Sequence, residues 1–287
     1  MPGGNAVNRM DNLYMPAVKP SVVFGLLGLG LFIGVALFAP WIAPYPADKV
    51  VGGAWLGPMP QAWLGTDNIG RDLFSRLIWG TRTSLAVTAL AAALAFVLGT
   101  GLGFLAGVCG GWVDQLISRV NDVLMAIPTL ILALVVLAML PKSTLIIILV
   151  LGVLEATRVL RVSRALAVDI ATQEFIEAAR LRGESMGWIL WREILPNARN
   201  TLVAEFALRF IFILLFLSAL SFLGLGIQPP TADWGGLARD NKDGILFGVW
   251  AALVPGAAIA LLAVSLNVVA DWLLGRDGRN WRGGRHE

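Results

Sequence analysis

Long uncharged apolar runs alternate with shorter polar segments along the chain. A helix of about 20 residues crosses a bilayer core of about 30 Å, and five runs come close to that length or exceed it. These runs are residues 22–44, 84–109, 123–140, 210–227 and 245–270. A sixth run, 144–154, is apolar but short, and a full crossing requires extending it over 141–161, through Glu155 and Arg158. The pattern predicts an all-α polytopic membrane protein with six transmembrane helices.

The basic residues indicate how these six spans are oriented. With the amino terminus inside, fourteen Lys and Arg residues fall on the cytoplasmic side and seven on the outer side. The inner set is Arg9, Lys19, Arg119, Arg158, Arg161, Arg164, Arg180, Arg182, Arg192, Arg199, Arg276, Arg279, Arg282 and Arg285, and the outer set is Lys49, Arg71, Arg76, Arg82, Lys142, Arg239 and Lys242. This excess is the positive-inside bias, so both termini are predicted to be cytoplasmic. Without the sixth span, the arginine-rich loop that follows it would lie with the external loops.

Composition agrees with a membrane protein and excludes several classes of function. The chain is 57% hydrophobic and 14% charged, against roughly 25% charged in soluble domains. The first apolar run is longer than the ~7–15 residues of a secretory signal core, which predicts an uncleaved anchor.

Cys109 and His286 are the sole cysteine and histidine, so we expect no metal site and no enzyme. The five clear spans hold no midplane Asp or Glu for ion coupling, which disfavours an ATP-independent channel or secondary transporter.

Glycine and proline positions indicate how the spans pack. Gly99, Gly103, Gly107 and Gly111 recur every fourth residue, which places them on one helix face that a neighbouring backbone can approach. Gly30 and Gly34 repeat this spacing in the first span, although glycine is common in membrane helices in any case. Pro128 and Pro255 fall inside predicted spans, where protein or a water-lined cavity must cover the missing hydrogen bonds.

The longest cytoplasmic segment, 162–200, has the signals of two short helices. Thr172, with Glu174 and Glu177 after it, predicts a helix start, and Gly183 predicts its stop. A second helix is expected from about Ser185 until Pro196 ends it. Two short helices separated by a glycine form a compact projection that can enter a groove on a partner.

This segment resembles the coupling loop of binding-protein-dependent ABC importer permeases. The residues that carry the resemblance are Glu177, Ala178 and Ala179, then Gly183, and finally Ile194, Leu195 and Pro196. The position of the loop between spans four and five is also that of the family. The resemblance implies a type I ABC importer permease fold in the bacterial inner membrane. Arg182 stands where relatives more often have an apolar residue.

The resemblance also implies partners. In that family the loop docks on a separate ATPase subunit, and the importer holds two such subunits, a second homologous permease and a periplasmic or lipid-anchored substrate-binding protein. This chain has no Gly-Lys pair and therefore no phosphate-binding loop. We expect no cofactor in this chain, with ATP and Mg bound by the ATPase subunits. Membrane lipids surround it, and no nucleic acid partner is expected.

Two external motifs narrow the family. The first comprises Gly65, Thr66, Asp67, Gly70, Arg71 and Asp72, and the second ends in Pro229 and Pro230. Both resemble the second permease subunit of dipeptide, oligopeptide and nickel importers, so peptides are the expected substrate, with nickel or another small solute as the alternative. The Asp67–Gly70 stretch predicts a turn. The apolar residues that follow predict either a helix at the outer interface or a loop running into span two. Pro229 and Pro230 are expected to end span five.

Four charged residues are candidates for a pathway or gate. Glu155 is expected either to meet a substrate amino group or, the preferred interpretation, to pair with Arg158 near the cytoplasmic surface. Glu205 and Arg209 have the four-residue spacing of a helical salt bridge. Their preferred interpretation is snorkelling to the inner interface, with a gate contact as the alternative.

The predicted organisation has five parts. A cytoplasmic tail of residues 1–21 precedes the first transmembrane helix at 22–44 and an external segment at 45–83. Residues 84–274 form a five-helix permease core that includes the coupling loop 162–200. Residues 275–287 form a cytoplasmic tail.

Overall fold

The computed structural model describes residues 20–247 and 249–283, which are helical apart from turns and isolated bridges. The elements are α1 (Pro20–Ile42), α2 (Leu73–Cys109), α3 (Gly111–Ala126), α4 (Thr129–Met139), α5 (Thr144–Ala171), α6 (Glu174–Leu181), α7 (Met186–Trp188), the π-helical turn η2 (Ile189–Ile194), α8 (Leu195–Phe222), α9 (Trp234–Asn241), the 3₁₀ turns η3 (Lys242–Phe247) and η4 (Trp250–Ala252), and α10 (Leu253–Gly283). The predicted tails lie partly outside the described residues.

Four of these helices are long and apolar enough to cross a membrane, judged by length and composition. They are Pro20–Ile42, Leu73–Cys109, Met186–Phe222 and Trp250–Trp272, and the bent pair α3 and α4 gives a fifth if it forms one span. α5 has 28 residues but carries Glu155, Arg158 and Arg161 in its middle. An all-helical membrane protein is therefore confirmed with four or five candidate spans in the described part, and the sixth stays a prediction.

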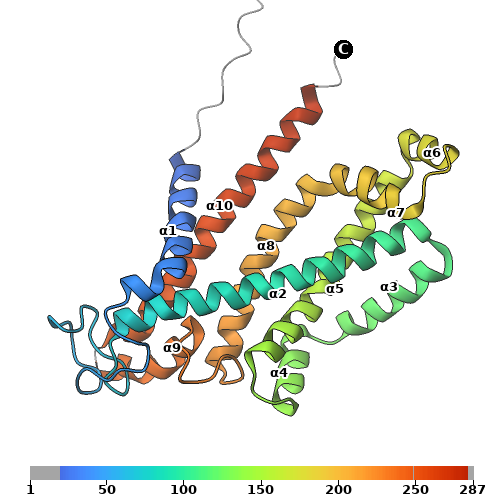
Figure 1. Cartoon of the computed structure of the whole chain (residues 1–287). Coiled ribbons are helices and arrows are strands. Elements are labelled where there is room, and N and C mark those ends of the chain that lie inside the picture. The colour runs from blue at the N-terminus through green and yellow to red at the C-terminus, as the bar shows by residue number, and fades with distance from the viewer. Residues whose placement is uncertain (1–19, 248, 284–287) are drawn as a thin grey trace, which may run out of the picture.

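The helices form a bundle in which α5 packs more extensively on α2 than any other described pair of elements does. α1 lies beside α10, and α8 contacts both α2 and α10. The start of α1, the end of α10 and the whole of α6 lie at one end of the molecule, while the 43–72 segment and α9 lie at the other (Figure 1). The predicted coupling-loop residues of α6 and the external motif of residues 65–72 therefore lie at opposite ends of the bundle.

Glycines explain the close approach of α2 and α5. A Cβ atom on Gly103 would lie 2.6 Å from the carbonyl oxygen of Leu160. A Cβ atom on Gly99 would lie 2.7 Å, and one on Gly107 2.9 Å, from a backbone oxygen of α5. The predicted packing face is thus confirmed at these three positions. Gly111 is not part of it, because α2 ends at Cys109.

The predicted packing face of the first span is wrong. Gly30 and Gly34 have no heavy atom within 4 Å of a Cβ position, whereas Gly25 and Gly28 face Ser265 of α10. Gly25 and Gly28 are three residues apart and Gly30 and Gly34 are four apart, and either spacing places a pair on one helix face. The position of α10 therefore decides which pair is used.

Predicted span three, 123–140, is not a continuous helix. α3 and α4 meet at an angle of 85°, and the first of the two residues between them, Ile127, is extended with φ −93° and ψ 132°. Pro128 explains this break, because its ring disfavours helical backbone in the residue before it and it has no N–H to donate.

Two other predicted boundaries are corrected. α2 begins at Leu73, with the carboxylate of Asp72 accepting a hydrogen bond from the Ser75 N–H at 2.8 Å. The apolar residues 73–78 are therefore the first turns of α2 and not a separate interfacial helix. α8 ends at Phe222, where Gly224 has φ +89°. The helix ends before Pro229 and Pro230, which lie in the following turn.

We predict that Gly103→Val lowers the free energy of unfolding by about 1–3 kcal/mol, because the added side chain meets rigid backbone on α5. Gly101→Val is the matched control, since it lies on the same helix with no heavy atom within 4 Å of its Cβ position. Thermal unfolding in detergent measures both variants. Equal stability of the two variants would contradict the close packing.

Candidate functional site

α6 is a short helix that projects from one end of the bundle (Figure 1). It begins after Gln173, with Glu174 and Glu177 in its first turn and Arg180 in its last. Acidic residues near the start of a helix and basic residues near its end interact favourably with the helix dipole, so these charges stabilise α6. Thr172, the expected start, instead directly follows the last residue of α5, Ala171, so the predicted helix is present but begins slightly later.

Gly183 ends α6 as predicted. Its φ is +80°, a conformation that favours glycine. The Gly183 N–H donates to the Arg180 carbonyl at 2.9 Å, and the Glu184 N–H donates to the Ala179 carbonyl at 3.2 Å. These two bonds form a Schellman motif, which turns the chain sharply back toward the bundle.

Burial divides the motif residues of this segment into two groups. Ile176 and Ala179 on α6 are fully buried against a cluster that includes Ile189 and Ile194. Glu177, Ala178 and Pro196 are exposed, and Leu195 is half-buried. Ala179 and Ile194 therefore hold the projection onto the bundle, while Glu177 and Ala178 are available to a partner.

Pro196 does not end the second helix. The helical chain from α7 continues through η2 into α8, and the Leu195 N–H bonds to the carbonyl of Leu190, five residues earlier. A proline normally clashes with the carbonyl four residues before it. The wider π-helical turn precedes that proline directly, which relieves the clash and lets α8 continue.

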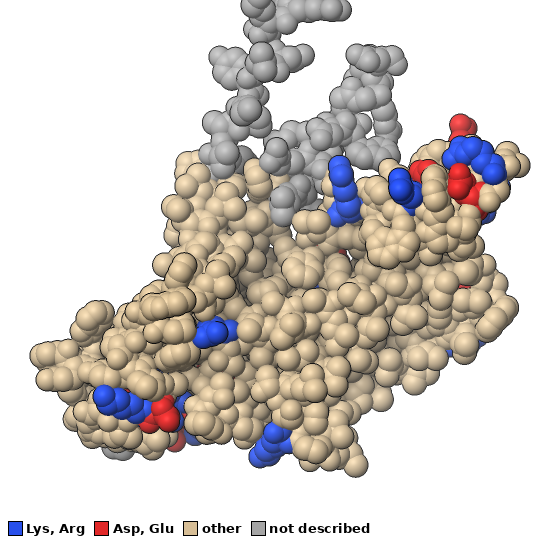
Figure 2. All heavy atoms as spheres, viewed as in Figure 1, with Lys and Arg blue, Asp and Glu red and all other residues tan. Residues whose placement is uncertain are grey.

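The exposed end of α6 combines an apolar side chain with charges. We call Glu177, Ala178, Leu181 and Arg182 the α6 tip; Leu181 is 84% exposed. Figure 2 shows blue and red atoms gathered at the upper right, where Figure 1 places α6. An exposed leucine among charged residues is suited to a protein contact with an apolar centre and a polar rim.

The first external motif forms a closed network around Asp67, whose side chain is fully buried. Its carboxylate accepts from the Ile69 N–H at 3.0 Å and the Arg71 N–H at 2.8 Å, which confirms the predicted turn. It also pairs with the guanidinium groups of Arg71, at 2.7 Å, and Arg76. Burial by itself would raise the pKa of Asp67, but these hydrogen bonds and positive charges together hold its pKa below the ordinary value of 3.8.

Residues of α9 complete this network, and sequence reasoning missed them. Asp240 lies 3.9 Å from both Arg71 and Arg76, and the side chain of Asn241 accepts from the Asn68 N–H at 3.0 Å. The pairing joins segments more than 160 residues apart, and no local pattern signals it. The motif residues therefore fasten the external segment to α9.

A buried ion cluster joins α5 to α8. Arg209 lies 2.8 Å from Glu205, the predicted partner, and 3.4 Å from Glu155. The expected pairing of Glu155 with Arg158 is wrong, because Arg209 occupies that place from the neighbouring helix. Glu205 and Arg209 are each only 13% exposed, so snorkelling to the interface is also wrong. One guanidinium group thus lies between two carboxylates, one from each of two packed helices.

A second ion pair, which was not predicted, also links two helices that are distant in sequence. Arg164 on α5 donates to both carboxylate oxygens of Asp114 on α3, at 2.6 Å for one of the two bonds. A bidentate arginine–carboxylate pair fixes orientation as well as distance. It holds the first half of the broken helix against α5.

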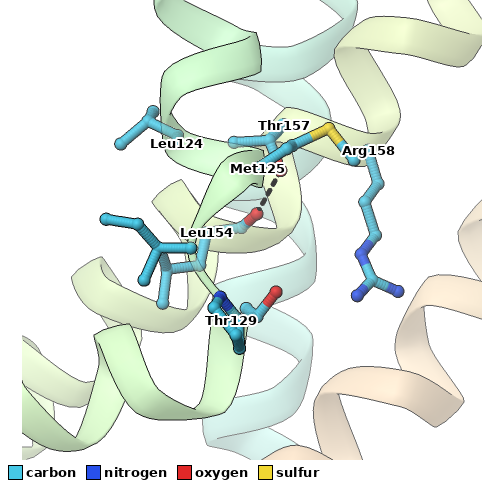
Figure 3. Close-up of a pocket in the computed structure, with 8 residues that line it drawn as sticks. Leu124, Met125, Thr129, Leu154, Thr157 and Arg158 are labelled. Carbon is cyan, nitrogen blue, oxygen red and sulfur yellow. Dashed lines mark hydrogen bonds between the residues drawn. The ribbon is translucent and has the colours of Figure 1, made fainter.

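A cavity of about 240 Å³ opens where α3 and α4 meet (Figure 3). It is lined by Leu124, Met125, Ile127, Pro128, Thr129, Leu154, Thr157 and Arg158. Arg158 extends from α5 along the side of this opening, while the Thr157 hydroxyl donates to the Leu154 carbonyl at 2.7 Å. Of the four charged pathway candidates, the structure thus gathers three in one cluster and leaves Arg158 at the cavity.

Residues 99–276 match the family described as binding-protein-dependent transport system inner membrane component, and residues 19–58 match the N-terminal TM domain of oligopeptide transport permease C. A dipeptide transport system permease of Alkalihalophilus pseudofirmus is 34% identical over 88% of this chain and 83% of its own length. A di/tripeptide transport system permease of Pseudomonas aeruginosa is 34% identical over 93% and 96%. A glutathione transport system permease of Escherichia coli is 38% identical over 85% and 81%.

Among solved structures, an inward-facing MetNI methionine ABC transporter has a chain similar to this one. The TM-score is 0.57 at 19% sequence identity, over 71% of this chain and 97% of that chain. At this identity the similarity supports the fold alone. The described helices therefore share the fold of an ABC importer permease.

We predict that Asp67→Asn lowers the free energy of unfolding by about 3 kcal/mol at neutral pH, because Arg71 and Arg76 lose their closest carboxylate. The wild-type contribution is fully present above pH 3.8 and is lost as the pH falls below that value through the lowered pKa of Asp67. The variant should lack this acid transition. Thermal unfolding in detergent between pH 7 and pH 3 measures both effects.

The exposed Asp48 in the same external segment provides the control variant Asp48→Asn. We expect it to keep wild-type stability and acid response. An Asp67→Asn variant that matched this control would show that the network contributes little to stability.

Proposed function

Because the chain belongs to the family of binding-protein-dependent transport system inner membrane components, we propose that it is the second permease subunit of an ATP-binding-cassette importer for peptides. The observation that carries the proposal is the similarity to dipeptide, di/tripeptide and glutathione permeases over most of the chain. Glutathione is itself a tripeptide, so these relatives are named for one chemical class. The importer lies in the bacterial inner membrane, and this subunit is not an enzyme.

In the proposed topology α5 is the sixth span. Its 28 residues extend about 42 Å as a helix, more than a bilayer core requires. Two of its three central charges have oppositely charged neighbours, since Glu155 pairs with Arg209 and Arg161 lies 3.5 Å from Asp122. With α5 counted, α6 and both termini lie on the cytoplasmic side, and α9 lies outside.

The proposed coupling surface is the α6 tip, which docks on a separate ATPase subunit that binds ATP and Mg. Support comes from its exposure and from its firm attachment through Ile176 and Ala179 to the start of α8. A push on α6 is thereby passed to α8, and from α8 to α5 through the buried cluster around Arg209. The remaining proposed partners are a second ATPase subunit, a homologous permease and an external substrate-binding protein.

We predict that Leu181→Asp lowers ATP-driven peptide uptake by at least about tenfold, because a charge replaces the apolar centre of the contact. The variant should assemble in the membrane normally, since the Leu181 side chain is largely exposed. Uptake of labelled peptide into vesicles that hold the complete importer is the measurement, with ATP hydrolysis recorded in parallel.

Gln173→Asp is the matched control, because it adds the same charge at the start of α6, where acidic residues stabilise a helix. It should transport at the wild-type rate. Wild-type uptake by Leu181→Asp would overturn the coupling role of the tip. Absence of ATP-dependent peptide uptake by the wild-type importer would overturn the proposed function itself.

A further inference from the structure

The break between α3 and α4 leaves irregular backbone within a segment that is apolar enough to cross the membrane. Ile127 and Pro128 are both extended, and the two helices diverge by 85°. Backbone that leaves helical geometry inside a bilayer must be covered by protein or line a polar cavity, because lipid cannot satisfy its hydrogen bonds. Here it borders the cavity of about 240 Å³ described above.

Arg158 brings a positive charge to this cavity. It is partly buried, and no carboxylate of the described residues pairs with its guanidinium group within 4.0 Å. Neighbouring acids are engaged elsewhere: Glu155 with Arg209, and Asp122 with Arg161. A partly buried arginine without a counter-charge is costly, so an anion at the cavity would stabilise it.

The size and chemistry of the cavity limit what that anion can be. A volume of about 240 Å³ is below the ~300–1,000 Å³ of sites that enclose a whole small molecule. The cavity therefore suits one end of a longer ligand. Thr129 adds a hydroxyl group, and Leu124, Met125 and Leu154 add apolar surface. A planar guanidinium group matches a carboxylate through two parallel hydrogen bonds.

We propose that Arg158 binds the C-terminal carboxylate of the peptide during passage, with the terminal side chain resting on the apolar part of the cavity. This inference rests on the proposed function, since it takes a peptide as the substrate. It assigns Arg158 a substrate-binding role that differs from the structural role of the buried cluster of Glu155, Glu205 and Arg209.

The test compares two tripeptides that differ only in the terminal group, a free acid and its amide, both first shown to bind the receptor protein. Uptake is measured at low peptide concentration in vesicles that hold the complete importer. For each peptide, uptake by the variant is divided by wild-type uptake, which cancels the preference of the receptor. We expect Arg158→Gln to lower uptake of the acid about tenfold and to leave the amide within about twofold of wild type.

Arg158→Lys keeps the charge and should retain most uptake of the acid, which keeps the test informative if the glutamine variant does not fold. Arg161→Gln is the matched control, because Arg161 lies one turn further along α5 and is largely exposed. It should leave uptake of both peptides unchanged.

The outcomes are distinguishable. Selective loss of the acid in Arg158→Gln, with retention in Arg158→Lys, supports the inference. Unchanged uptake of both peptides, or equal loss of both, overturns it, and equal loss would assign Arg158 to a contact with the second permease or a bound lipid. If the wild-type importer takes up neither peptide, the proposed function has failed together with the inference.

Discussion

A bilayer core offers no hydrogen bonds, so every polar group that a helix carries into it must find a partner within the protein or at a water-filled surface. This constraint accounts for the main features of the bundle. Glycines let the α2 backbone approach α5 closely, and Glu155 of α5 meets Glu205 and Arg209 of α8 in one buried cluster. Where α3 and α4 separate, the irregular backbone borders a cavity that also receives Arg158.

The same helices join the two ends of the molecule. α6 is seated on the start of α8 through buried apolar side chains, and the other end of α8 packs against α9. α9 in turn holds the external segment through Asp240 and Asn241. A helix that contacts the projection on one side and the external network on the other is a direct mechanical path across the bundle. The motif residues thus serve two purposes. Glu177 and Ala178 form an exposed surface, while Ala179 and Ile194 fasten that surface to the helix that continues into α8.

Sequence signals were reliable where the cause was local. Gly183 ends α6 because its backbone conformation favours glycine, Asp67 forms its turn with residues two and four further on, and Glu205 reaches Arg209 over one helical turn. They failed where the cause was a distant neighbour. Glu155 pairs with a residue 54 positions away, and Asp240 reaches the external motif from α9. One failure was local, because the π-helical turn before Pro196 keeps the helix continuous into α8.

The three named relatives transport dipeptides, di/tripeptides and glutathione, ligands that differ in length and in side chains. Each of these ligands ends in a carboxylate. A permease that binds side chains closely would have to be rebuilt for every peptide, whereas a cation beside an apolar cavity uses a terminal group that such ligands share. Placing that cation at a broken helix has a further physical advantage. The break already requires a polar opening, so the charge needs no additional cavity, and the small volume limits contact to the end of the peptide. In the proposed importer, selection among sequences is then left to the proposed receptor, and the proposed contact of Arg158 depends on the terminal group.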